Sequence, residues 1–276
     1  VDITDKDRNG NKVEGITILD LAATERSNFQ SYFHEIDAVV HLGHKHRSDD
    51  PLDAFHDEIE NVRMAYNVLR SAYEAKVPRI VVASSNHAAD WYEHALLHRR
   101  KMEVLDPYML PLSDNFYGWA KASYEHLGFI FACGFPSFPG FQGAYKDDLD
   151  IYGKDTSNQP GVVMVRIGAP RELDVNLYQN DLQGYKRDLG AYISSRDLTQ
   201  LFQRCIETPD INNEHGIPWQ VVYGISDNTR AFWSLSNARD ILGYCPEDDS
   251  EIKYAQDIQN LLTSKESNRG AGRLGG

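Results

Sequence analysis

Tyr117 and Lys121 stand four residues apart at the start of residues 117–130, an apolar segment that is compatible with a helix. On a helix, side chains at this spacing lie on one face, so a phenol and an ammonium would meet at one site. A free tyrosine has a pKa of about 10, and a neighbouring cation favours the phenolate and lowers that value. The pair could therefore transfer protons. The same spacing is also typical of a solvated helix face, so the surrounding residues have to decide.

Distinctive residues follow three apolar segments that are typical of β-strands. These strand ends are Asp20, His41-Leu42-Gly43 and Ser84-Ser85-Asn86-His87. A polar cluster after a single strand can equally be turn chemistry. In a doubly wound sheet, however, ligands bind outside the carboxyl ends of the strands. The three strand ends are therefore candidates for one ligand site.

The elements that would carry these residues alternate between strand and helix. Strands are expected at residues 16–19, 37–43, 78–83, 162–168 and 219–224, and helices at 27–33, 51–75, 117–130, 195–206 and 235–242. Residues 37–43 form a nearly continuous apolar run, which is typical of a parallel strand that is covered on both faces. The alternation predicts an α/β fold with a doubly wound parallel sheet. Residues 88–116 are expected to form a long connection with aromatic and charged residues, and residues 133–160 an insertion without clear periodicity. Residues 171–190 are a polar stretch rich in tyrosine, aspartate and arginine.

The composition argues against several classes of protein. With 41% hydrophobic and 25% charged residues in 276, the chain is ordinary for a globular domain, and no apolar run reaches the length of about 20 residues that a membrane span needs. A net charge of −13 argues against nucleic acid as a partner, because phosphate binding calls for a basic patch. Three widely spaced cysteines suit a reducing compartment, and the polar first residues are unlike a signal peptide. The expected location is the cytoplasm.

Several short motifs occur in a fixed order along the chain. They are Ser84-Ser85-Asn86-His87, Tyr117-x-x-x-Lys121, Val165-Arg166-Ile167-Gly168 and Val222-Tyr223-Gly224-Ile225-Ser226. With the first two, the sequence resembles the extended short-chain dehydrogenase/reductase superfamily, the NAD-dependent epimerase/dehydratase family. With the others, it is similar to uronate dehydrogenases and archaeal NAD-dependent glucose-6-phosphate dehydrogenases. The resemblance runs from Asp2 to about Asp249 and implies a Rossmann-like fold, NAD as the cofactor and a sugar as the substrate.

The resemblance implies a role for each residue of the catalytic motifs. Tyr117 would be the catalytic base, and Lys121 would lower its pKa and hold the ribose of the nicotinamide. Ser85 would hydrogen-bond the reacting hydroxyl. Asn86 and His87 would contact the sugar. The expected hydroxyl is the one at C1 of an aldose, hexuronate or hexose phosphate, so that oxidation gives a lactone.

The resemblance also implies a set of cofactor-binding residues. They are Asp2, Asp20, Leu21, Leu42, Gly43 and Asn61, together with Tyr117 and Lys121. Asp2 would bond the hydroxyls of the adenosine ribose, and a carboxylate there favours NAD over NADP because it repels the extra phosphate. Asp20 and Leu21 would lie beside the adenine, and Leu42 and Gly43 would flank the cofactor. The alternative for Asn61 is a solvated position on a helix.

Arg187 matches an arginine that pairs with the substrate carboxylate in uronate dehydrogenases. A bidentate guanidinium suits a carboxylate or a phosphate. The presence of Arg187 therefore does not show whether the substrate is a sugar acid or a sugar phosphate. Ala169 stands where uronate dehydrogenases have a substrate-binding serine, which leaves the identity of the sugar open.

The family's Gly-x-x-Gly-x-x-Gly loop, which binds the pyrophosphate of the cofactor, does not occur in the chain. The first βα unit is therefore expected to be missing before Asp2. Residues 1–165 are expected to form an NAD-binding core that is incomplete at its N-terminus, and residues 166–263 a mixed substrate-binding region with returning core elements. Residues 264–276 are expected to be a flexible tail. A homo-oligomer is the habit of the family.

Other functions use some of the same residues. A nucleotide-sugar epimerase or dehydratase would use the same tyrosine and lysine with a retained cofactor, and a catalytically silent cofactor-binding protein would need only the fold. His44 and His46, with Asp49 or Asp50 nearby, could suggest a metal site. They lie in one short polar loop without a second ligand cluster, so we expect no metal.

Overall fold

The computed structural model describes most of the chain. The described residues are 1–7, 9–45, 50, 52–134, 159–178 and 181–263. They form two compact units, each assembled from three segments of the chain. The first unit comprises residues 1–90, 111–165 and 209–221, and the second comprises 91–110, 166–208 and 222–276. The predicted tail at 264–276 and most of the predicted connection at 133–160 lie outside the described residues.

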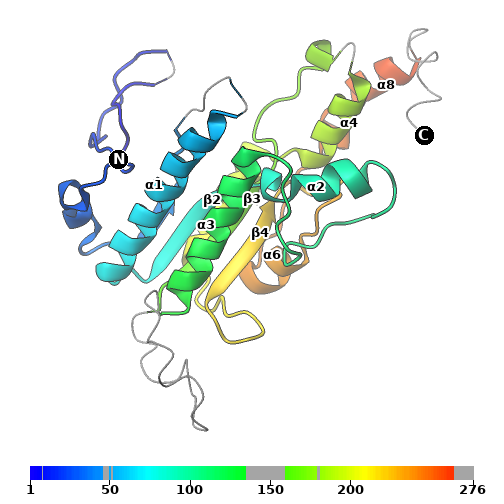
Figure 1. The fold of residues 1–276 in the computed structure, drawn as a ribbon. Helices are drawn as coiled ribbons and strands as arrows, with labels where there is room; N and C mark the ends of the chain where they lie inside the picture. Colours follow the sequence, from blue (N-terminus) through cyan, green and yellow to red (C-terminus); the bar gives the residue numbers. More distant parts are fainter. Residues whose placement is uncertain (8, 46–49, 51, 135–158, 179–180, 264–276) are drawn as a thin grey trace. The chain divides into compact units, whose positions relative to one another are not determined.

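A four-stranded sheet has the order β1-β2-β3-β4 (Figure 1). Its strands are β1 (Ala38–His41), β2 (Arg79–Ser85), β3 (Gly161–Ile167) and β4 (Trp219–Gly224). The pairing of β1 with β2 is parallel. All four lie where apolar runs predict strands, and β2 continues through Ser84 and Ser85, which the sequence places after the strand. The α/β architecture with a parallel sheet is therefore confirmed.

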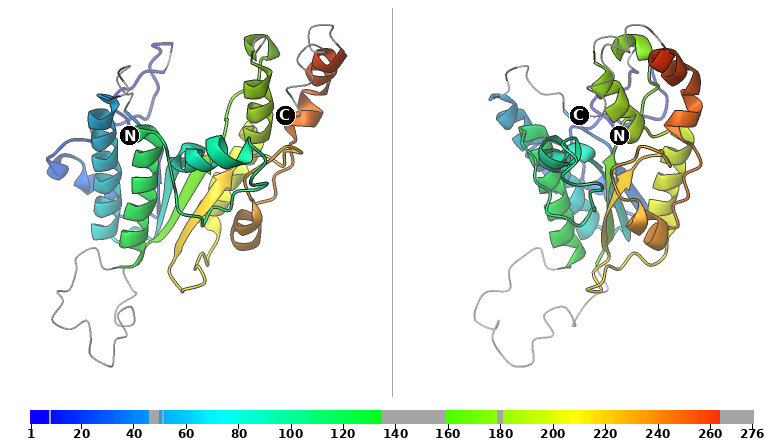
Figure 2. Two further views of the ribbon diagram at one scale, coloured as in Figure 1. Left: turned by 45° about the vertical axis from the view of Figure 1, so that its right-hand side comes forward. Right: turned by 90° about the vertical axis from the view of Figure 1, so that its right-hand side faces the viewer.

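Two long helices of the first unit lie side by side and pack against the strands (Figures 1 and 2). They are α1 (Ala54–Glu74) and α3 (Phe116–Ala132), and both match predicted helices. Val68 and Leu69 of α1 and Tyr124 of α3 are fully buried in the apolar core, which also takes Ile80 and Val82 from β2. This core fixes the start of α3 relative to the end of β2.

Two glycines let α3 approach its neighbours closely. A Cβ atom on Gly118 would lie 1.9 Å from the backbone oxygen of His87 and 2.1 Å from Oγ of Ser113. A Cβ on Gly128, three turns further along, would lie 2.0 Å from Cε of Met164 on β3. The first contact is with backbone and the second with the end of a flexible side chain, so they differ in how easily they can relax.

Near the N-terminus the structure corrects two predictions. No strand forms at residues 16–19; a single parallel bridge joins Asp2 and Ile18. Leu19 packs against the core, but Ile18 is 59% exposed and only the one bridge pairs the segment with another strand. The helix predicted at 27–33 is instead two 3₁₀ turns, η1 (Arg26–Asn28) and η2 (Gln30–Phe33). The intervening Phe29 has φ −132°, which interrupts helical backbone.

The second unit is built mainly from short helices. They are η4 (a π-helix, Glu93–Leu97), η7 (Val175–Tyr178), α4 (Leu182–Ala191), α5 (Ser195–Glu207), α6 (Ser236–Leu242), α7 (Ser250–Lys253) and α8 (Ala255–Thr263). The first unit also contains η3 (Asn86–Ala89), and α2 (Asp90–Tyr92) follows it in the chain. The long connection expected at 88–116 contains η4, and the polar stretch at 171–190 contains α4. The helix expected at 235–242 is present as α6, and it ends before Gly243, which has φ 67°.

Two of the sequence motifs meet inside the second unit. Arg166, at the end of β3, is 1% exposed, and its Nη1 donates a hydrogen bond of 3.0 Å to the hydroxyl of Tyr223 on β4. Tyr223 in turn stacks on Trp233 with a ring distance of 5.4 Å. A Cβ on Gly168 would lie 2.2 Å from the backbone oxygen of Ala191. These motifs therefore have a structural role, which is to satisfy a buried guanidinium and to bring α4 close to β3.

None of the helices in the described part of the chain is long and apolar enough to cross a membrane.

We expect Gly118→Ala to lower the free energy of unfolding by about 1–3 kcal/mol, because its methyl group meets the backbone oxygen of His87. Gly128→Ala is the matched control in the same helix. There Met164 can move its terminal carbon, and the change should stay within about 1 kcal/mol of the parent. Urea denaturation of both variants measures the difference. Equal stability of Gly118→Ala and the parent would contradict the close contact between α3 and η3.

Candidate active site

The start of α3 is held by hydrogen bonds on both sides of its N-cap residue. Asn115 Oδ1 accepts from the backbone N–H of Gly118 at 2.9 Å, which caps the helix. Asn115 Nδ2 donates to Oδ2 of Asp90 at 2.8 Å. Asp90, 3% exposed, also contacts Nδ1 of His87 at 2.7 Å. One buried carboxylate therefore ties the segment after β2 to the first turn of α3, where Tyr117 lies.

Lys121 is buried one turn after Tyr117. It is 4% exposed, and its Nζ donates a hydrogen bond of 2.9 Å to the backbone oxygen of Ala83 on β2. Its ammonium lies 5.7 Å from the ring centroid of Tyr117 and 4.5 Å from that of Tyr124. The predicted shared face of Tyr117 and Lys121 is thus present. It turns inward to the sheet and is not a solvated helix face.

Burial lowers the pKa of Lys121 to about 8, and the carboxylates of Glu58 and Glu125 oppose that effect. Both carboxylates are buried, Glu58 on α1 and Glu125 one turn further along α3. Glu125 accepts a hydrogen bond of 2.7 Å from the hydroxyl of Ser84. The lysine therefore retains its charge at neutral pH because two acids from two helices compensate its burial.

The ring of Tyr117 contacts two imidazole rings. Its ring centroid is 5.5 Å from that of His87 and 5.3 Å from that of His44, both in edge-on geometry. The sequence predicts His87 as a sugar contact, and the structure brings it to Tyr117. It predicts His44 only as a polar residue of a loop, so the position of His44 at Tyr117 is a feature that sequence reasoning missed. Its proximity depends on the loop after β1, for which the sequence holds no signal.

Ser85, Asn86 and His87 occupy the end of β2 and the first turn of η3. All three belong to one short motif, and Ser85 and Asn86 are 5% and 2% exposed. Ser85 Oγ accepts a hydrogen bond of 3.3 Å from the backbone N–H of His87, which makes Ser85 the N-cap of η3. The turn places Ser85 and His87 at the same strand end. The structure therefore groups the three predicted sugar-binding residues with Tyr117 and Lys121 in the first unit.

His41 is a further buried group of this site, at the end of β1. It is 4% exposed, and within the described part of the chain its Nε2 has no hydrogen-bond partner. Burial lowers the pKa of His41 to about 4, and the positive charges of Lys121 and His44 add to that effect. The imidazole is therefore neutral at neutral pH.

Comparison with known proteins shows the family of this chain. Residues 1–131 match the NAD dependent epimerase/dehydratase family. The NAD-dependent glucose-6-phosphate dehydrogenase of Haloferax volcanii is 31% identical over 234 residues, which cover 82% of this chain and 74% of that protein. The chain belongs to the NAD-dependent epimerase/dehydratase family. The predicted resemblance is thereby confirmed, and with it the Rossmann-like fold and an NAD-dependent oxidoreductase as the class of enzyme.

Two further relatives extend this picture. The uronate dehydrogenase of Pseudomonas syringae pv. tomato is 25% identical over 245 residues, or 88% of this chain and 70% of that protein. Among solved structures, the uronate dehydrogenase of Agrobacterium tumefaciens has a TM-score of 0.63 at 24% identity and covers 95% of this chain and 78% of that one. A mutant of the same enzyme was solved in complex with NAD. At this identity the structural likeness speaks for the fold.

The residues after β1 fit the cofactor of the epimerase/dehydratase family. Asn61 of α1, 0% exposed, donates to the backbone oxygen of Lys45 at 3.1 Å and accepts from its N–H at 2.7 Å. The predicted cofactor asparagine thus holds the loop that carries Leu42 and Gly43, and it is not a solvated helix residue. A Cβ on Gly43 would lie 3.0 Å from Sδ of Met64, so a larger residue here would have to displace that side chain of α1.

Asp2, Asp20 and Leu21 lie at a second place that fits the cofactor. The parallel bridge sets the backbone of Asp2 beside residues 17–19, with Leu19 N–H donating to the oxygen of Asp2 at 2.8 Å. Asp2 is exposed, so its carboxylate can reach ribose hydroxyls. Asn67 of α1 donates to the backbone oxygen of Leu21 at 2.8 Å and fixes the adjoining loop. The binding roles of these residues stay predictions.

Arg187 lies in the second unit, on α4, and its guanidinium is engaged by protein carboxylates. Nε and Nη2 donate to Glu93 at 2.8 and 3.2 Å, and Nη1 donates to Asp188 at 3.0 Å. Burial alone would raise the pKa of Glu93, but hydrogen bonds from His98 and Arg187 bring it down to about 2. The carboxylate is thus ionised and holds the arginine in place. The predicted role of Arg187 in binding substrate stays a prediction.

The loop histidines that could suggest a metal site lie only partly within the described residues. Among the described residues no group of three or more metal-ligating side chains could hold an ion. His46 and Asp49 lie outside the described residues, and His44 contacts Tyr117.

The neutral state of His41 predicts a specific dependence of stability on pH. Its pKa is about 4 in the folded protein against an ordinary 6.5. The unfolded chain therefore binds a proton that the folded chain excludes as the pH falls from about 6.5 to 4, and stability is lost over that range. In His41→Gln this loss should be smaller by up to about 3 kcal/mol.

Chemical denaturation at several pH values between these limits measures the difference for His41. His34→Gln is the control, because His34 is exposed in the same unit and its replacement should leave the pH dependence unchanged. If the parent and His41→Gln lose stability in parallel as the pH falls, the inference that His41 is buried in its neutral form is wrong.

Asp90 is expected to act by orienting His87 and Asn115. Asp90→Asn removes the charge that both side chains contact, and we expect kcat/KM to fall by about 10- to 100-fold with NAD affinity little changed. Asp114→Asn is the matched control, because Asp114 accepts a longer bond of 3.2 Å from the same Asn115 and is exposed. Steady-state kinetics and NAD titration of both variants test this. A fall of equal size in both variants would assign the effect to the helix cap alone.

Proposed function

We propose that this protein is a sugar dehydrogenase that oxidises the C1 hydroxyl of an aldose, a hexuronate or a hexose phosphate to a lactone, with Tyr117 as the base. The observation that carries the proposal is the buried ammonium of Lys121, fixed by the backbone oxygen of Ala83 one helical turn from Tyr117. A cation held in a low dielectric favours the phenolate strongly. On a solvated helix face, the ammonium four residues after Tyr117 would be exposed to water and not buried.

The surrounding residues divide the remaining tasks. Tyr117 takes the proton from the sugar hydroxyl, and Ser85 donates a hydrogen bond to the same oxygen. His87, held by Asp90, and Asn86 contact the other hydroxyls of the sugar. His44, in edge-on contact with the Tyr117 ring, helps to keep that ring in place and limits access of water to it.

NAD, when bound, accepts the hydride that leaves C1. The residues that would hold it are Asp2 at the adenosine ribose, Leu42 and Gly43 at the loop after β1, and Lys121 at the nicotinamide ribose. Asn61 supports this set indirectly, because it fixes the backbone of Lys45 next to the loop. The sugar substrates named for the relatives from Haloferax volcanii and Pseudomonas syringae pv. tomato support the same substrate class.

Two further expectations belong to the proposal. We place the enzyme in the cytoplasm, as the cysteine usage suggests, and we expect a homo-oligomer by family habit. Size-exclusion chromatography with light scattering tests the second.

Tyr117→Phe is expected to lower kcat/KM by about a thousandfold or more, because the variant cannot accept the proton. The ring and its contacts with His44 and His87 remain, so NAD affinity should stay close to that of the parent. Tyr32→Phe is the control, since Tyr32 is 50% exposed and remote from the helix. NADH formation measures turnover and fluorescence titration measures NAD binding. Retained turnover in Tyr117→Phe would rule out this residue as the base.

The substrate class is tested by a screen of the full-length enzyme with NAD. Free aldoses, hexuronates, hexose phosphates and nucleotide sugars are incubated separately, and NADH formation is followed. The proposal expects net NADH from at least one of the first three classes and none from nucleotide sugars. Conversion of a nucleotide sugar without net NADH would show an epimerase or dehydratase instead.

A further inference from the structure

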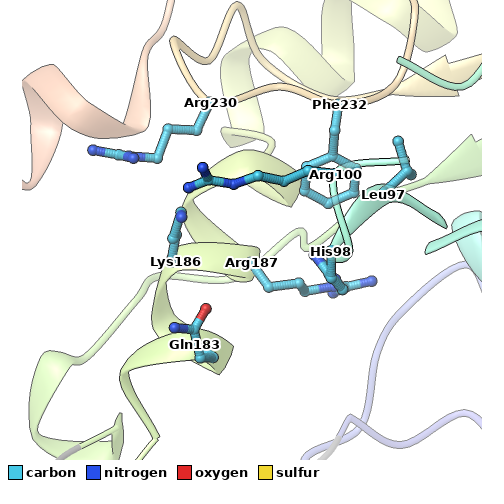
Figure 3. Close-up of a pocket in the computed structure, with 8 residues that line it drawn as sticks. All are labelled: Leu97, His98, Arg100, Gln183, Lys186, Arg187, Arg230 and Phe232. Atoms are coloured by element: carbon cyan, nitrogen blue, oxygen red, sulfur yellow. The ribbon is translucent and has the colours of Figure 1, made fainter. Parts of the chain in front are cut away.

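Buried carboxylates fix basic side chains at two places in this protein. In the second unit, Glu93 accepts hydrogen bonds from Arg187 and contacts His98, and these two basic residues line a cavity (Figure 3). In the first unit, Asp90 contacts His87. In both cases a buried acid decides where a basic side chain lies. A further buried carboxylate is therefore a candidate for the same role.

Glu58 is such a carboxylate. It lies on α1 and is 0% exposed. Its Oε2 accepts a hydrogen bond of 3.2 Å from Nδ2 of Asn61, one turn further along the helix. A buried carboxylate is stable only where donors or cations compensate its charge, so Glu58 constrains the groups around it.

The bond from Asn61 fixes which way its side-chain amide faces. An ionised carboxylate has no proton to donate, so the amide nitrogen of Asn61, and not its oxygen, must point to Glu58. The oxygen is then left for the backbone N–H of Lys45 at 2.7 Å, and the amide nitrogen also donates to the backbone oxygen of Lys45 at 3.1 Å. All three contacts need this one orientation. Glu58 therefore helps to fix the loop at residues 42–45.

The same carboxylate acts on the ammonium of Lys121. Burial lowers the pKa of Lys121 to about 8, and Glu58 opposes this effect more strongly than Glu125 does. Burial, and after it Glu58, raises the pKa of Tyr124, whose ring centroid lies 4.5 Å from Nζ of Lys121. The charge of Glu58 therefore acts on two neighbouring side chains of α3, although Glu58 belongs to α1.

The titratable side chains near Lys121 and Tyr117 come from several elements of the first unit. They include His41 of β1, Glu58 of α1, Tyr124 and Glu125 of α3, and His44 and His87, which contact Tyr117. Burial lowers the pKa of His41 to about 4 and raises that of Tyr124, so neither side chain is charged at neutral pH. The two glutamates supply the negative charge of this set, and Tyr117 is the group whose ionisation the ammonium of Lys121 favours.

We propose that Glu58 is a positioning residue for both parts of the site, because its buried carboxylate maintains the charge of Lys121 and, through Asn61, holds the loop at residues 42–45. The catalytic role of Lys121 and the cofactor role of the loop belong to the proposed function, and the consequences for activity rest on it. The two contacts of Glu58 do not. One carboxylate thus makes the charge of the lysine and the place of the loop depend on the same group.

The first measurement follows Lys121 and the backbone of Lys45 by NMR, without substrate or cofactor. Labelling the lysines with ¹³C gives the titration midpoint of Lys121, whose signal is assigned by its loss in Lys121→Met. Hydrogen exchange of the Lys45 amide reports its bond to Asn61. Two variants separate the two effects. Glu58→Gln removes the charge and keeps an acceptor oxygen, and Glu58→Met removes both.

Both variants of Glu58 should lower the midpoint of Lys121 by about one pH unit or more, because an opposing charge is lost while burial remains. Exchange of the Lys45 amide should be about tenfold faster in Glu58→Met, where Asn61 loses a buried acceptor. In Glu58→Gln it should change by less than about threefold, because the amide oxygen of the glutamine can still accept.

Glu60 provides the matched control. It lies on the same helix, two residues after Glu58, and its carboxylate forms an ion pair with Nζ of the same Lys45. Its side chain is 37% exposed, and ion pairs in water contribute little. The same two replacements at Glu60 should leave the midpoint of Lys121 within about 0.3 pH unit of the parent and the exchange of the Lys45 amide within about twofold.

The second measurement is functional. Titration with NAD should show an affinity about tenfold lower in Glu58→Met, because the loop at residues 42–45 is less well fixed, and a change of less than about threefold in Glu58→Gln. With a sugar that the enzyme oxidises, the alkaline limb of the pH profile of kcat/KM should move to lower pH in both variants, in step with the midpoint of Lys121.

The outcomes separate the inference from the proposed function. An unchanged midpoint of Lys121 in Glu58→Gln, unchanged exchange of the Lys45 amide in Glu58→Met, or equal changes at Glu58 and Glu60 would each overturn the inference. If both NMR effects occur but NAD affinity and the pH profile do not follow, Glu58 positions these groups and the roles proposed for them are wrong. Circular dichroism checks the fold of each variant. Glu58→Gln is nearly isosteric, so it decides the effect on Lys121 even if Glu58→Met does not fold.

Discussion

The ammonium of Lys121 is the group on which the arrangement of the first unit depends. A buried charge is expensive unless it is hydrogen-bonded and compensated. Here the backbone oxygen of Ala83 accepts its hydrogen bond, and Glu58 and Glu125 supply the opposing charge. The three partners come from β2, α1 and α3 itself. One cation thus requires all three elements to be at their places at once.

This requirement explains why the helix begins as it does. The ammonium reaches β2 only if the first turns of α3 lie very close to the strand end, and Gly118 removes the Cβ that would meet the oxygen of His87. The same closeness brings Asn115 within hydrogen-bond distance of Asp90. The contact of the Tyr117 ring with His87 follows from this packing, because Asp90 holds both His87 and Asn115 at the start of α3.

Much of the fold could be predicted from the sequence because its signals are local. The four strands are apolar runs, and α1 and α3 have apolar faces that continue over several turns. The parts that were missed lack such signals. The α4 helix is rich in polar and charged residues, and its burial is decided by contacts such as that of Gly190 with Arg230. Residues 16–19 have the composition of a strand, but they meet only the short segment at Asp2 and form one bridge.

The candidate site divides in the same way. Tyr117, Lys121 and residues 85–87 were found from the sequence, because spacing and motif order are visible without coordinates. The partners Glu58 and His44 were not, since each reaches the site from a distant part of the chain. Glu125 lies only four residues after Lys121, but the helix period alone does not show that it is buried beside that lysine. Sequence reasoning finds groups that do chemistry more readily than groups that set their charge and position.

Arg187 shows that a sequence motif can identify a residue without revealing what that residue binds. A sequence match identifies a guanidinium at a position, but the partners of that guanidinium decide what it can bind. With Glu93 and Asp188 accepting from its three nitrogens, Arg187 carries little uncompensated charge, whatever the residue type suggests. A sequence match therefore identifies a residue type, and the contacts of that residue in the fold decide how much of its charge remains for a ligand.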